Sequence, residues 1–331
     1  MIITKTPFRI SFFGGGTDYP AHYKEYGGQV LATSINKYCY ITCRVLPPFF
    51  DHKYRIAYST IENTRTIDEI VHPAVRGVLN HLGVSKGLEI HHDGDLPARS
   101  GLGSSSSFTA GLLNAVHAIN GRMISKYDLA MQAINIEQNV IGEKVGSQDQ
   151  VMAAIGGLNH VLFNTDESID VRPVVISDEK KNTLNDHLLM FFSGITRDSQ
   201  SITTQKINSI TSKPRDVIML GEMVTEALSI LAAPDGDLLD FGRLLDEGWK
   251  CKRSLSNNIS NDTIDQIYKI GIDNGAIGGK LMGAGGGGFI CFFAPPEKHQ
   301  SIKNALSSFI HVPFKFEKGG STICVYEPNG F

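Results

Sequence analysis

Residues 96–108 constrain the fold of this chain more than any other stretch, because Gly101, Gly103 and the run of four serines at 104–107 lie between a strand-like and a helix-like run. Alternation over 87–91 predicts the strand, and the apolar run 108–119 predicts the helix. Gly101 and Gly103 allow a tight bend and the close approach of a ligand. The amides and positive dipole of a helix that begins here would attract phosphate, and its serines could cap the helix or reach a cation. A serine-rich cap that binds nothing is the alternative.

Length and composition narrow the class of protein. A chain of 331 residues is long enough for two domains with a well-buried core. Its formal net charge of −3 gives no electrostatic reason to expect nucleic acid or an anionic membrane as a partner. We also expect no transmembrane helix, because no apolar run approaches about 18 residues. The N-terminus lacks the order of a signal peptide, and the five cysteines lack zinc-site spacing, so we expect free thiols and a cytosolic location.

Strand-like and helix-like segments alternate along the chain. Strands are predicted over 2–6, 9–13, 30–34, 38–45, 54–59, 87–91, 158–163, 188–192, 289–293 and 321–326. Helices are predicted over 67–83, 106–120, about 15 residues from 125, the apolar segment 149–155, much of 198–231 and 236–275, and 298–309. This order favours an α+β or mixed α/β fold.

Two features near the N-terminus indicate a polar site. Arg9 lies in an otherwise apolar strand, where an arginine is costly unless it meets an anion. The segment 14–20 contains three glycines, Thr17 and Asp18, and we expect an open loop that offers amides, a hydroxyl and a carboxylate. A plain turn in which Asp18 caps a short helix is the alternative.

Two carboxylates further along are predicted to lie at helix ends. Glu137 comes at the C-terminal end of the helix that opens at Ser125, where a carboxylate opposes the helix dipole. Asp149 falls in the first turn of the apolar helix that follows Gly146. A solvated surface glutamate and an ordinary N-terminal helix carboxylate are the alternatives to functional roles.

The glycine-rich stretches do not fit common nucleotide-binding patterns. The sequence around Gly101 is one residue off the dinucleotide fingerprint and lacks the acidic residue expected about 20 positions later. After Lys280, Leu281 stands where the Walker A pattern requires serine or threonine. We find neither the strand lysine nor the catalytic-loop aspartate of a protein kinase. Phosphate would therefore be bound by another scheme.

Three segments together resemble the motifs of the GHMP kinases, the family of galactokinase, homoserine kinase, mevalonate kinase and phosphomevalonate kinase. They lie at 7–19, 97–105 and 280–288, so the resemblance covers nearly all of the chain. It implies two α+β domains with an active site between them. The N-terminal domain, 1–190, would resemble domain 2 of ribosomal protein S5, and the C-terminal domain, 191–331, would be ferredoxin-like.

The resemblance also implies roles for individual residues. Asp149 would accept the proton of the acceptor hydroxyl, and Arg9 would keep that carboxylate ionised and orient the sugar oxygen. Mg²⁺ would be held by Ser105 (or Ser104) and Glu137. The residues implied to bind ATP are Pro97, Arg99, Gly101, Leu102, Gly103, Ser104, Ser105, Ser106 and Ser107. The residues implied to bind substrate are Gly15, Gly16, Thr17, Asp18, Tyr19, Arg197, Gly283, Gly285 and Gly286.

The first motif bears on the acceptor. Galactokinases carry Glu and His where this chain has Gly15 and Gly16, so two side chains that hold galactose are missing and a larger substrate has room. The variant is similar to that of the D-glycero-D-manno-heptose 7-phosphate kinases within the family. This similarity implies ATP-dependent phosphorylation of the anomeric O1 to give the 1,7-bisphosphate, for the synthesis of nucleotide-activated heptose.

A sugar that already bears a phosphate needs cations at the far end of its pocket. The candidates are Arg197, Arg99, Lys37 and Lys252, each of which could instead be a solvated surface residue. The expected partners are a sugar phosphate and ATP, with Mg²⁺, in a monomer or homodimer. A kinase of another sugar such as L-fucose, and a non-catalytic sensor of sugar and ATP, stay open.

Overall fold

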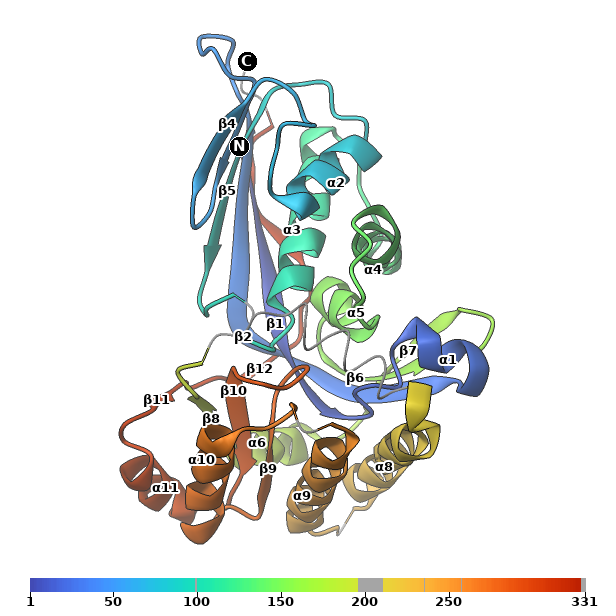
Figure 1. Cartoon of the computed structure of the whole chain (residues 1–331), viewed down its shortest axis with the longest axis vertical. Coiled ribbons are helices and arrows are strands. Elements are labelled where there is room, and N and C mark those ends of the chain that lie inside the picture. The colour runs from blue at the N-terminus through green and yellow to red at the C-terminus, as the bar shows by residue number, and fades with distance from the viewer. Residues whose placement is uncertain (99, 196–210, 235, 257, 329–331) are drawn as a thin grey trace.

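Two long strands run through the larger part of the molecule. In the computed structural model, which describes residues 1–98, 100–195, 211–234, 236–256 and 258–328, β1 (Ile2–Phe13) and β2 (Gly28–Val45) pair antiparallel. They run from the end that holds both chain termini to the junction with a second, smaller layer of helices and strands (Figure 1).

The larger sheet is built around β1 and β2. Its other strands are β3 (Tyr54–Ala57), β4 (Ile61–Thr64), β5 (Leu88–Gly94), β6 (Leu158–Phe163), β7 (Ile169–Pro173), β12 (Phe316–Glu317) and β13 (Thr322–Tyr326). Its main order is β13-β1-β2-β5-β3-β4, and β6 pairs with the N-terminal half of β2. Because β13 pairs with β1, the end of the chain returns to the strand that starts it.

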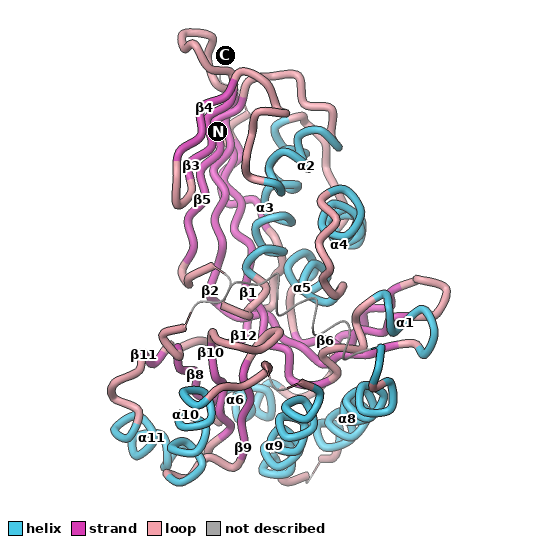
Figure 2. Tube along the Cα trace, viewed as in Figure 1, coloured by secondary structure: helices cyan, strands magenta, loops and turns pink. Residues whose placement is uncertain are grey.

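Helices cover one face of this sheet (Figure 2). They are α2 (Pro73–His81), α3 (Ser104–Ile119), α4 (Lys126–Asn135), the π-helical turn η1 (Ile136–Val140) and α5 (Gln148–Ile155), while α1 (Pro20–Tyr26) follows β1 at the junction. Burial alternates along the strands accordingly: Ile2, Thr4 and Thr6 are buried beneath the helices, whereas Ile3 and Lys5 on the other face are partly exposed. Helix α3 is buried over most of its length, so the loop before it is anchored by the core.

The smaller sheet has the order β11-β8-β10-β9 in the described residues. Its strands are β8 (Leu188–Phe192), β9 (Gly278–Leu281), β10 (Phe289–Phe293) and β11 (Ile310–His311). The helices of this part of the chain are α6 (Asp178–Asp186), α8 (Pro214–Ala232), α9 (Leu238–Leu255), α10 (Asp262–Asp273), η2 (Pro296–Lys298) and α11 (His299–Ala305). Along β10, Phe289 and Phe293 join the core that continues from the larger sheet, whereas Ile290 and Phe292 join a second core with Trp249. The smaller sheet is therefore buried on both faces.

The predicted α+β fold is confirmed, with differences in element bounds. The strands predicted on either side of Pro7 form one strand, because the proline sits at a register shift rather than ending the pairing. The helix predicted over 67–83 begins only at Pro73, where His72 accepts a hydrogen bond from the amide of Val75. The polar helix α6 and the short strands β4 and β7 have weak apolar patterns and were not predicted.

Three further expectations concern the domain boundary, the cysteines and membrane-spanning helices. The division at 190/191 stays a prediction; β8 spans it, and β12 and β13 return from the later segment to the larger sheet. All five cysteines are free, and Cys39, Cys43 and Cys291 are buried. In the described part of the chain, no helix is both long and apolar enough to cross a membrane.

Phe241 of α9 links the two sheets, so its truncation should destabilise the whole chain. Its ring lies 5.3 Å from that of Phe12 and 5.1 Å from that of Phe13 in β1, and 6.0 Å from that of Phe293 in β10. We expect Phe241→Ala to lower the free energy of unfolding by about 3–5 kcal/mol, measured by chemical denaturation. Val175→Ala, at a side chain that is 92% exposed, is the control and should change it by less than about 0.5 kcal/mol. A loss of under 1 kcal/mol for Phe241→Ala would contradict this link.

Candidate active site

An arginine–aspartate pair lies where the larger sheet, α3 and α5 meet. Arg9 of β1 donates from Nε to Oδ1 of Asp149 at 2.8 Å, and its Nη2 lies 2.6 Å from the same oxygen. The Arg9 side chain is buried, whereas 28% of the Asp149 side chain is exposed, so the carboxylate is accessible from one side. The prediction that the strand arginine meets an anion is confirmed. The pair joins two residues that are 140 positions apart.

The second of the three glycine loops, residues 97–105, contacts this pair directly. Arg9 also donates from Nη1 to the carbonyl oxygen of Gly101 at 2.8 Å, and its amide donates to that of Leu102 at 3.0 Å. Gly103 adopts a φ of +79°, and a Cβ there would lie 3.3 Å from Cγ of Arg9 and 3.5 Å from Cγ of Asp149. Helix α3 begins at the next residue, so its N-terminal amides and positive dipole end lie beside the carboxylate. An anion at this helix end would therefore lie next to a base.

The third glycine loop, residues 282–288 between β9 and β10, packs against the second one, backbone to backbone. A Cβ on Gly101 would stand 2.6 Å from the carbonyl oxygen of Met282, and one on Gly288 would stand 2.1 Å from that of Ser100. Because there is no space for side chains, the loops between β9 and β10 and before α3 meet through these glycines. Gly283, Gly285 and Gly286, which are predicted to contact substrate, all have positive φ values in this loop.

One buried lysine holds the third loop, and a second ties the preceding strand β9 to β1. The ammonium of Lys252 in α9 donates to the carbonyl oxygens of Leu281 at 3.0 Å and Gly283 at 2.6 Å. That of Lys280 donates to the carbonyl oxygen of Phe12 at 2.6 Å. Lys252, one of the four cations considered for a distal phosphate, therefore supports a loop in this structure.

The first glycine loop, residues 14–20, is folded inward. The expectation of an open loop with exposed polar side chains is therefore wrong. The hydroxyl of Thr17 donates to the carbonyl oxygens of Gly14 and Gln29, both at 2.8 Å. Asp18 is 1% exposed, and Tyr19 is buried as well. Gly15 remains partly exposed, and it lies near the hydroxyl of Ser11 and the side-chain amide of Gln148. These tertiary contacts could not be inferred from the loop's composition.

Glu137 is buried in η1 against the start of α3. Its Oε2 accepts hydrogen bonds from Oγ of Ser106 at 2.9 Å and from Nε2 of Gln150 at 2.5 Å, while its Oε1 has no protein partner. Burial raises the pKa of Glu137 to about 7, and the nearby hydroxyl groups offset part of this rise. The alternative of a solvated surface glutamate is therefore wrong.

The structure brings Ser106, rather than the predicted Ser105, to Glu137. Successive helix residues are rotated by about 100°, and at this phase Ser106 faces the core while Ser105 is exposed. Ser107 is also turned inward, and its hydroxyl donates to the carbonyl oxygen of Pro7 at 2.9 Å. Ser106 and Gln150 thus support Glu137, and Gln148 donates from Nε2 to Oδ2 of Asp18 at 2.9 Å. The two glutamines flank Asp149 in the sequence, which was the only local signal for them.

Glu137→Gln should change the pH dependence of stability. Between the ordinary pKa of about 4.5 and about 7, folded Glu137 holds a proton that the unfolded chain has released, so stability falls as pH rises through this range. The glutamine cannot titrate. We therefore expect Glu137→Gln to be more stable than the parent by about 2 kcal/mol at pH 8 and similar to it at pH 4.5, measured by denaturation without divalent cations. Equal stabilities at both pH values would contradict the raised pKa.

The remaining predicted residues do not all join this cluster. Arg99 and Arg197 lie outside the described residues. Pro97 is exposed at the start of the second loop, and Lys37 is partly exposed in β2.

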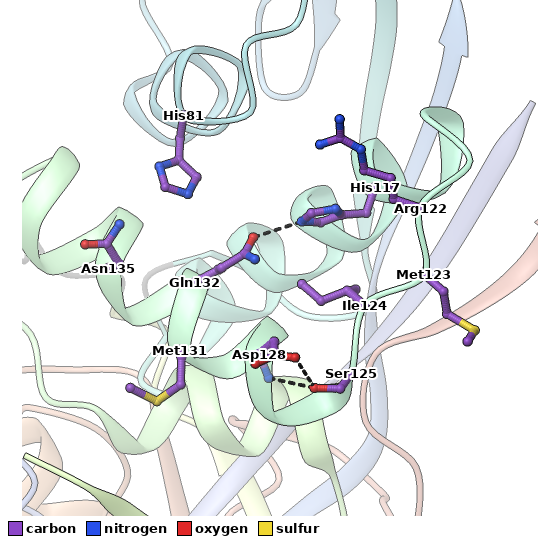
Figure 3. A pocket seen from close by; sticks show the side chains of 10 residues that line it. All are labelled: His81, His117, Arg122, Met123, Ile124, Ser125, Asp128, Met131, Gln132 and Asn135. Carbon is purple, nitrogen blue, oxygen red and sulfur yellow. Dashed lines mark hydrogen bonds between the residues drawn. The ribbon is translucent and has the colours of Figure 1, made fainter.

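A separate hollow lies between α2, α3 and α4 (Figure 3). Its polar groups include His117, whose Nε2 lies 2.8 Å from Oε1 of Gln132, and Ser125, whose hydroxyl donates to Asp128 at 2.6 Å. None of the predicted site residues lines this hollow, so the candidate active site is the cluster around Arg9 and Asp149.

Comparisons with known proteins match both parts of the chain to one family. The profile described as "GHMP kinases N terminal domain" matches residues 69–157, and the one described as "GHMP kinases C terminal" matches residues 226–311. The first match contains the second glycine loop, Glu137 and Asp149.

Individual relatives agree with these matches. The chain is 30% identical to D-glycero-alpha-D-manno-heptose 7-phosphate kinase of Campylobacter jejuni, over 92% of this chain and 93% of that protein. It is 26% identical to L-fucokinase/L-fucose-1-P guanylyltransferase of Bacteroides fragilis, over 92% of this chain and 36% of that protein. Its fold matches a crystal structure of a D-glycero-D-manno-heptose 1-phosphate kinase from Bacteroides thetaiotaomicron with a TM-score of 0.75, at 23% identity over 99% of this chain and all of that one.

Proposed function

This chain belongs to the GHMP kinase family and is a sugar kinase, and on that premise we propose that it phosphorylates the anomeric O1 of D-glycero-D-manno-heptose 7-phosphate with ATP. The observation that carries this proposal is the Arg9–Asp149 pair beneath Gly103. It brings together a partly exposed carboxylate, a fixed cation and the start of a helix, which are groups that a phosphoryl transfer can use. The similarity to the heptose 7-phosphate kinase of C. jejuni supports the choice of acceptor.

The chemistry follows from this arrangement. The acceptor hydroxyl gives its proton to the Asp149 carboxylate while its oxygen forms a bond to the γ-phosphorus of ATP, and the bond from that phosphorus to the β-phosphate oxygen breaks to release ADP. The amides at the start of α3 stabilise charge on the phosphate oxygens. Arg9 holds the Asp149 carboxylate in place through two donors to one oxygen, so the other oxygen is left for the hydroxyl.

Mg²⁺ fits the residues around Glu137. The carboxylate has one oxygen with no protein partner, and serine hydroxyls of the first turn of α3 lie beside it. Mg²⁺ prefers oxygen ligands and commonly takes one or two carboxylates together with waters and substrate phosphates. In the described residues no group of three acidic, histidine or cysteine side chains could hold a metal. Such a cation would neutralise charge on the β- and γ-phosphates.

A panel of acceptors tests the proposal. Turnover of ATP with Mg²⁺ would be measured against heptose 7-phosphate, heptose 1-phosphate, L-fucose, galactose and mevalonate, with the product phosphate located by ³¹P NMR. We expect turnover with heptose 7-phosphate and a new phosphate on O1. Turnover of heptose 1-phosphate alone would move the transfer to another hydroxyl and overturn the proposed acceptor.

L-fucose is the second candidate acceptor, because the similarity to the fucokinase of B. fragilis extends over 92% of this chain. A better rate with L-fucose than with any heptose phosphate would select it and remove the need for a distal phosphate site. ATP binding without turnover of any acceptor would instead favour the sensor. The Arg9–Asp149 pair argues against the sensor, since binding alone needs no base.

A further inference from the structure

The ammonium group of Lys252 is buried where β9 passes into the third glycine loop. Lys252 lies in the last turn of α9 and is only 7% exposed. Its Nζ donates away from its own helix, to the carbonyl oxygens of Leu281 at 3.0 Å and Gly283 at 2.6 Å. A buried ammonium is costly unless polar groups take the place of water, and these two carbonyl groups serve that purpose. The lysine and the loop therefore hold each other in place.

The carbonyl group between these two lies against the second glycine loop. A Cβ on Gly101 would stand 2.6 Å from the carbonyl oxygen of Met282 and 3.2 Å from Cα of Gly283. Residues 281–283 thus contact Lys252 through their first and third carbonyl groups and Gly101 through the second. Because the backbone of Gly101 approaches this segment so closely, a displacement of residues 281–283 would displace the second loop as well.

Gly101 connects this segment to the candidate active site. Its carbonyl oxygen accepts a hydrogen bond from Nη1 of Arg9 at 2.8 Å, and the same guanidinium holds the carboxylate of Asp149. Two residues further, Gly103 leads into α3, whose first amides are the proposed site for the ATP phosphates. A continuous series of contacts therefore runs from α9 through the third loop to the groups that would carry out phosphoryl transfer.

The later half of the third loop has supports of its own. The amide of Gly286 donates to the carbonyl oxygen of Ile259 at 3.0 Å, and the amide of Gly288 donates to the carbonyl oxygen of Ile195 at 2.9 Å. Neither of these contacts involves α9. Removal of the Lys252 ammonium should therefore release residues 281–283 while residues 285–288 stay fixed.

We propose that Lys252 is a positioning residue, which fixes the carbonyl groups of Leu281 and Gly283 and thereby holds the second glycine loop in the geometry needed for phosphoryl transfer. Lys252 then does not bind the phosphate of the sugar, the other role for which it is a candidate. The inference deepens the proposed function and rests on it in one respect, namely that the second loop holds the ATP phosphates.

Three substitutions of Lys252 and one control test this role. Lys252→Met keeps the length of the side chain and removes its charge and its donors. Lys252→Gln is one atom shorter and removes the charge but keeps a polar end, in case the apolar variant does not fold. Lys252→Arg keeps a cation with several donors. Lys250→Met is the matched control, because Lys250 lies on the same helix, is 69% exposed and pairs with Asp246 at 2.7 Å.

The first readout needs no substrate. In the ligand-free protein we expect hydrogen–deuterium exchange over residues 280–284 and 100–107 to accelerate about tenfold in Lys252→Met and Lys252→Gln. Exchange over residues 285–288 should stay within about threefold of the parent, and Lys250→Met should match the parent throughout.

Three results of this measurement would overturn the inference. Unchanged exchange in whichever test variant folds would show that the lysine does not hold the loop. Acceleration confined to residues 280–284 would remove the link to the second loop, and equal acceleration over residues 285–288 would show a general loosening of the fold. The measurement decides the role of Lys252 even if no acceptor is turned over, so a failure of the proposed function stays distinguishable.

The second readout separates positioning of the second loop from binding of the sugar. With whichever acceptor is turned over, we expect kcat to fall about tenfold or more in Lys252→Met and Lys252→Gln, while the Kd of that acceptor by calorimetry changes less than about threefold. Lys252→Arg should recover kcat to within about threefold of the parent, because it still offers donors to both carbonyl groups. A rise in the acceptor Kd that accounts for the whole loss of kcat/KM would assign Lys252 to the sugar and overturn the inference.

Discussion

Asp149→Asn should lower kcat by about 10³-fold and leave the fold and ATP binding intact. An asparagine has nearly the same shape and can still accept a hydrogen bond from Arg9, but it cannot take a proton from the acceptor hydroxyl. A loss of this size is typical of removing a general base. The measurement is steady-state turnover of ATP with saturating acceptor, beside calorimetric ATP binding.

A carboxylate in an equivalent helical position controls for the loss of charge. Asp262 lies in the first turn of α10 and is exposed, so Asp262→Asn should change kcat by less than twofold. Near-full turnover by Asp149→Asn would remove this residue as the base. It would leave the family assignment untouched and direct the search to other groups near Gly103.

Arg9→Lys should lower kcat by about 10²-fold although the positive charge is kept. The guanidinium donates to Asp149 and to the carbonyl oxygen of Gly101 through separate nitrogens. A single ammonium does not reproduce this planar fork, so one of the two contacts is lost. The loss of the first would free the base to move, and the loss of the second would loosen the phosphate loop. Kinetics of the variant with ATP and the acceptor varied in turn measure the effect.

Arg9→Met should also destabilise the protein. Breaking a buried ion pair costs about 3–5 kcal/mol, and the partial exposure of Asp149 reduces the expected loss here to about 2 kcal/mol. Chemical denaturation measures this loss.

Arg44→Lys is the matched control for Arg9→Lys, because Arg44 makes a similar forked pair with Glu89 on the sheet face away from the helices. It should leave kcat unchanged. Equal kcat values for Arg9→Lys and the parent would contradict a specific role of the fork.

Much of the candidate site could be predicted because its residues are unusual for their local surroundings. Arg9 is a charge within an apolar strand, and Gly101 and Gly103 interrupt a strand–helix passage. Asp149 opens an apolar helix. Each of these conflicts with the local pattern, so each indicated a role beyond local structure, and the structure places the four together.

The supporting residues could not be predicted in the same way. Ser106 and Ser105 are equivalent as sequence, and only the rotation of α3 against η1 decides which one reaches Glu137. Asp18 looked like part of an open loop, yet its partners lie 130 positions away. Lys252 was a candidate to bind a distal phosphate, with a solvated surface residue as the alternative, and the carbonyl groups that hold it lie about 30 residues further along.

The sequence by itself therefore determined the α+β class, the family and the residue types of the site, because period, glycine placement and charge act over a few neighbouring positions. Only the tertiary structure decided which serine faces Glu137, that Asp18 is buried against Gln148, and that the second and third glycine loops meet without intervening side chains. The physical reason is that these contacts join segments between about 30 and 190 positions apart. Their geometry depends on how whole helices and sheets pack, which no short stretch of sequence records.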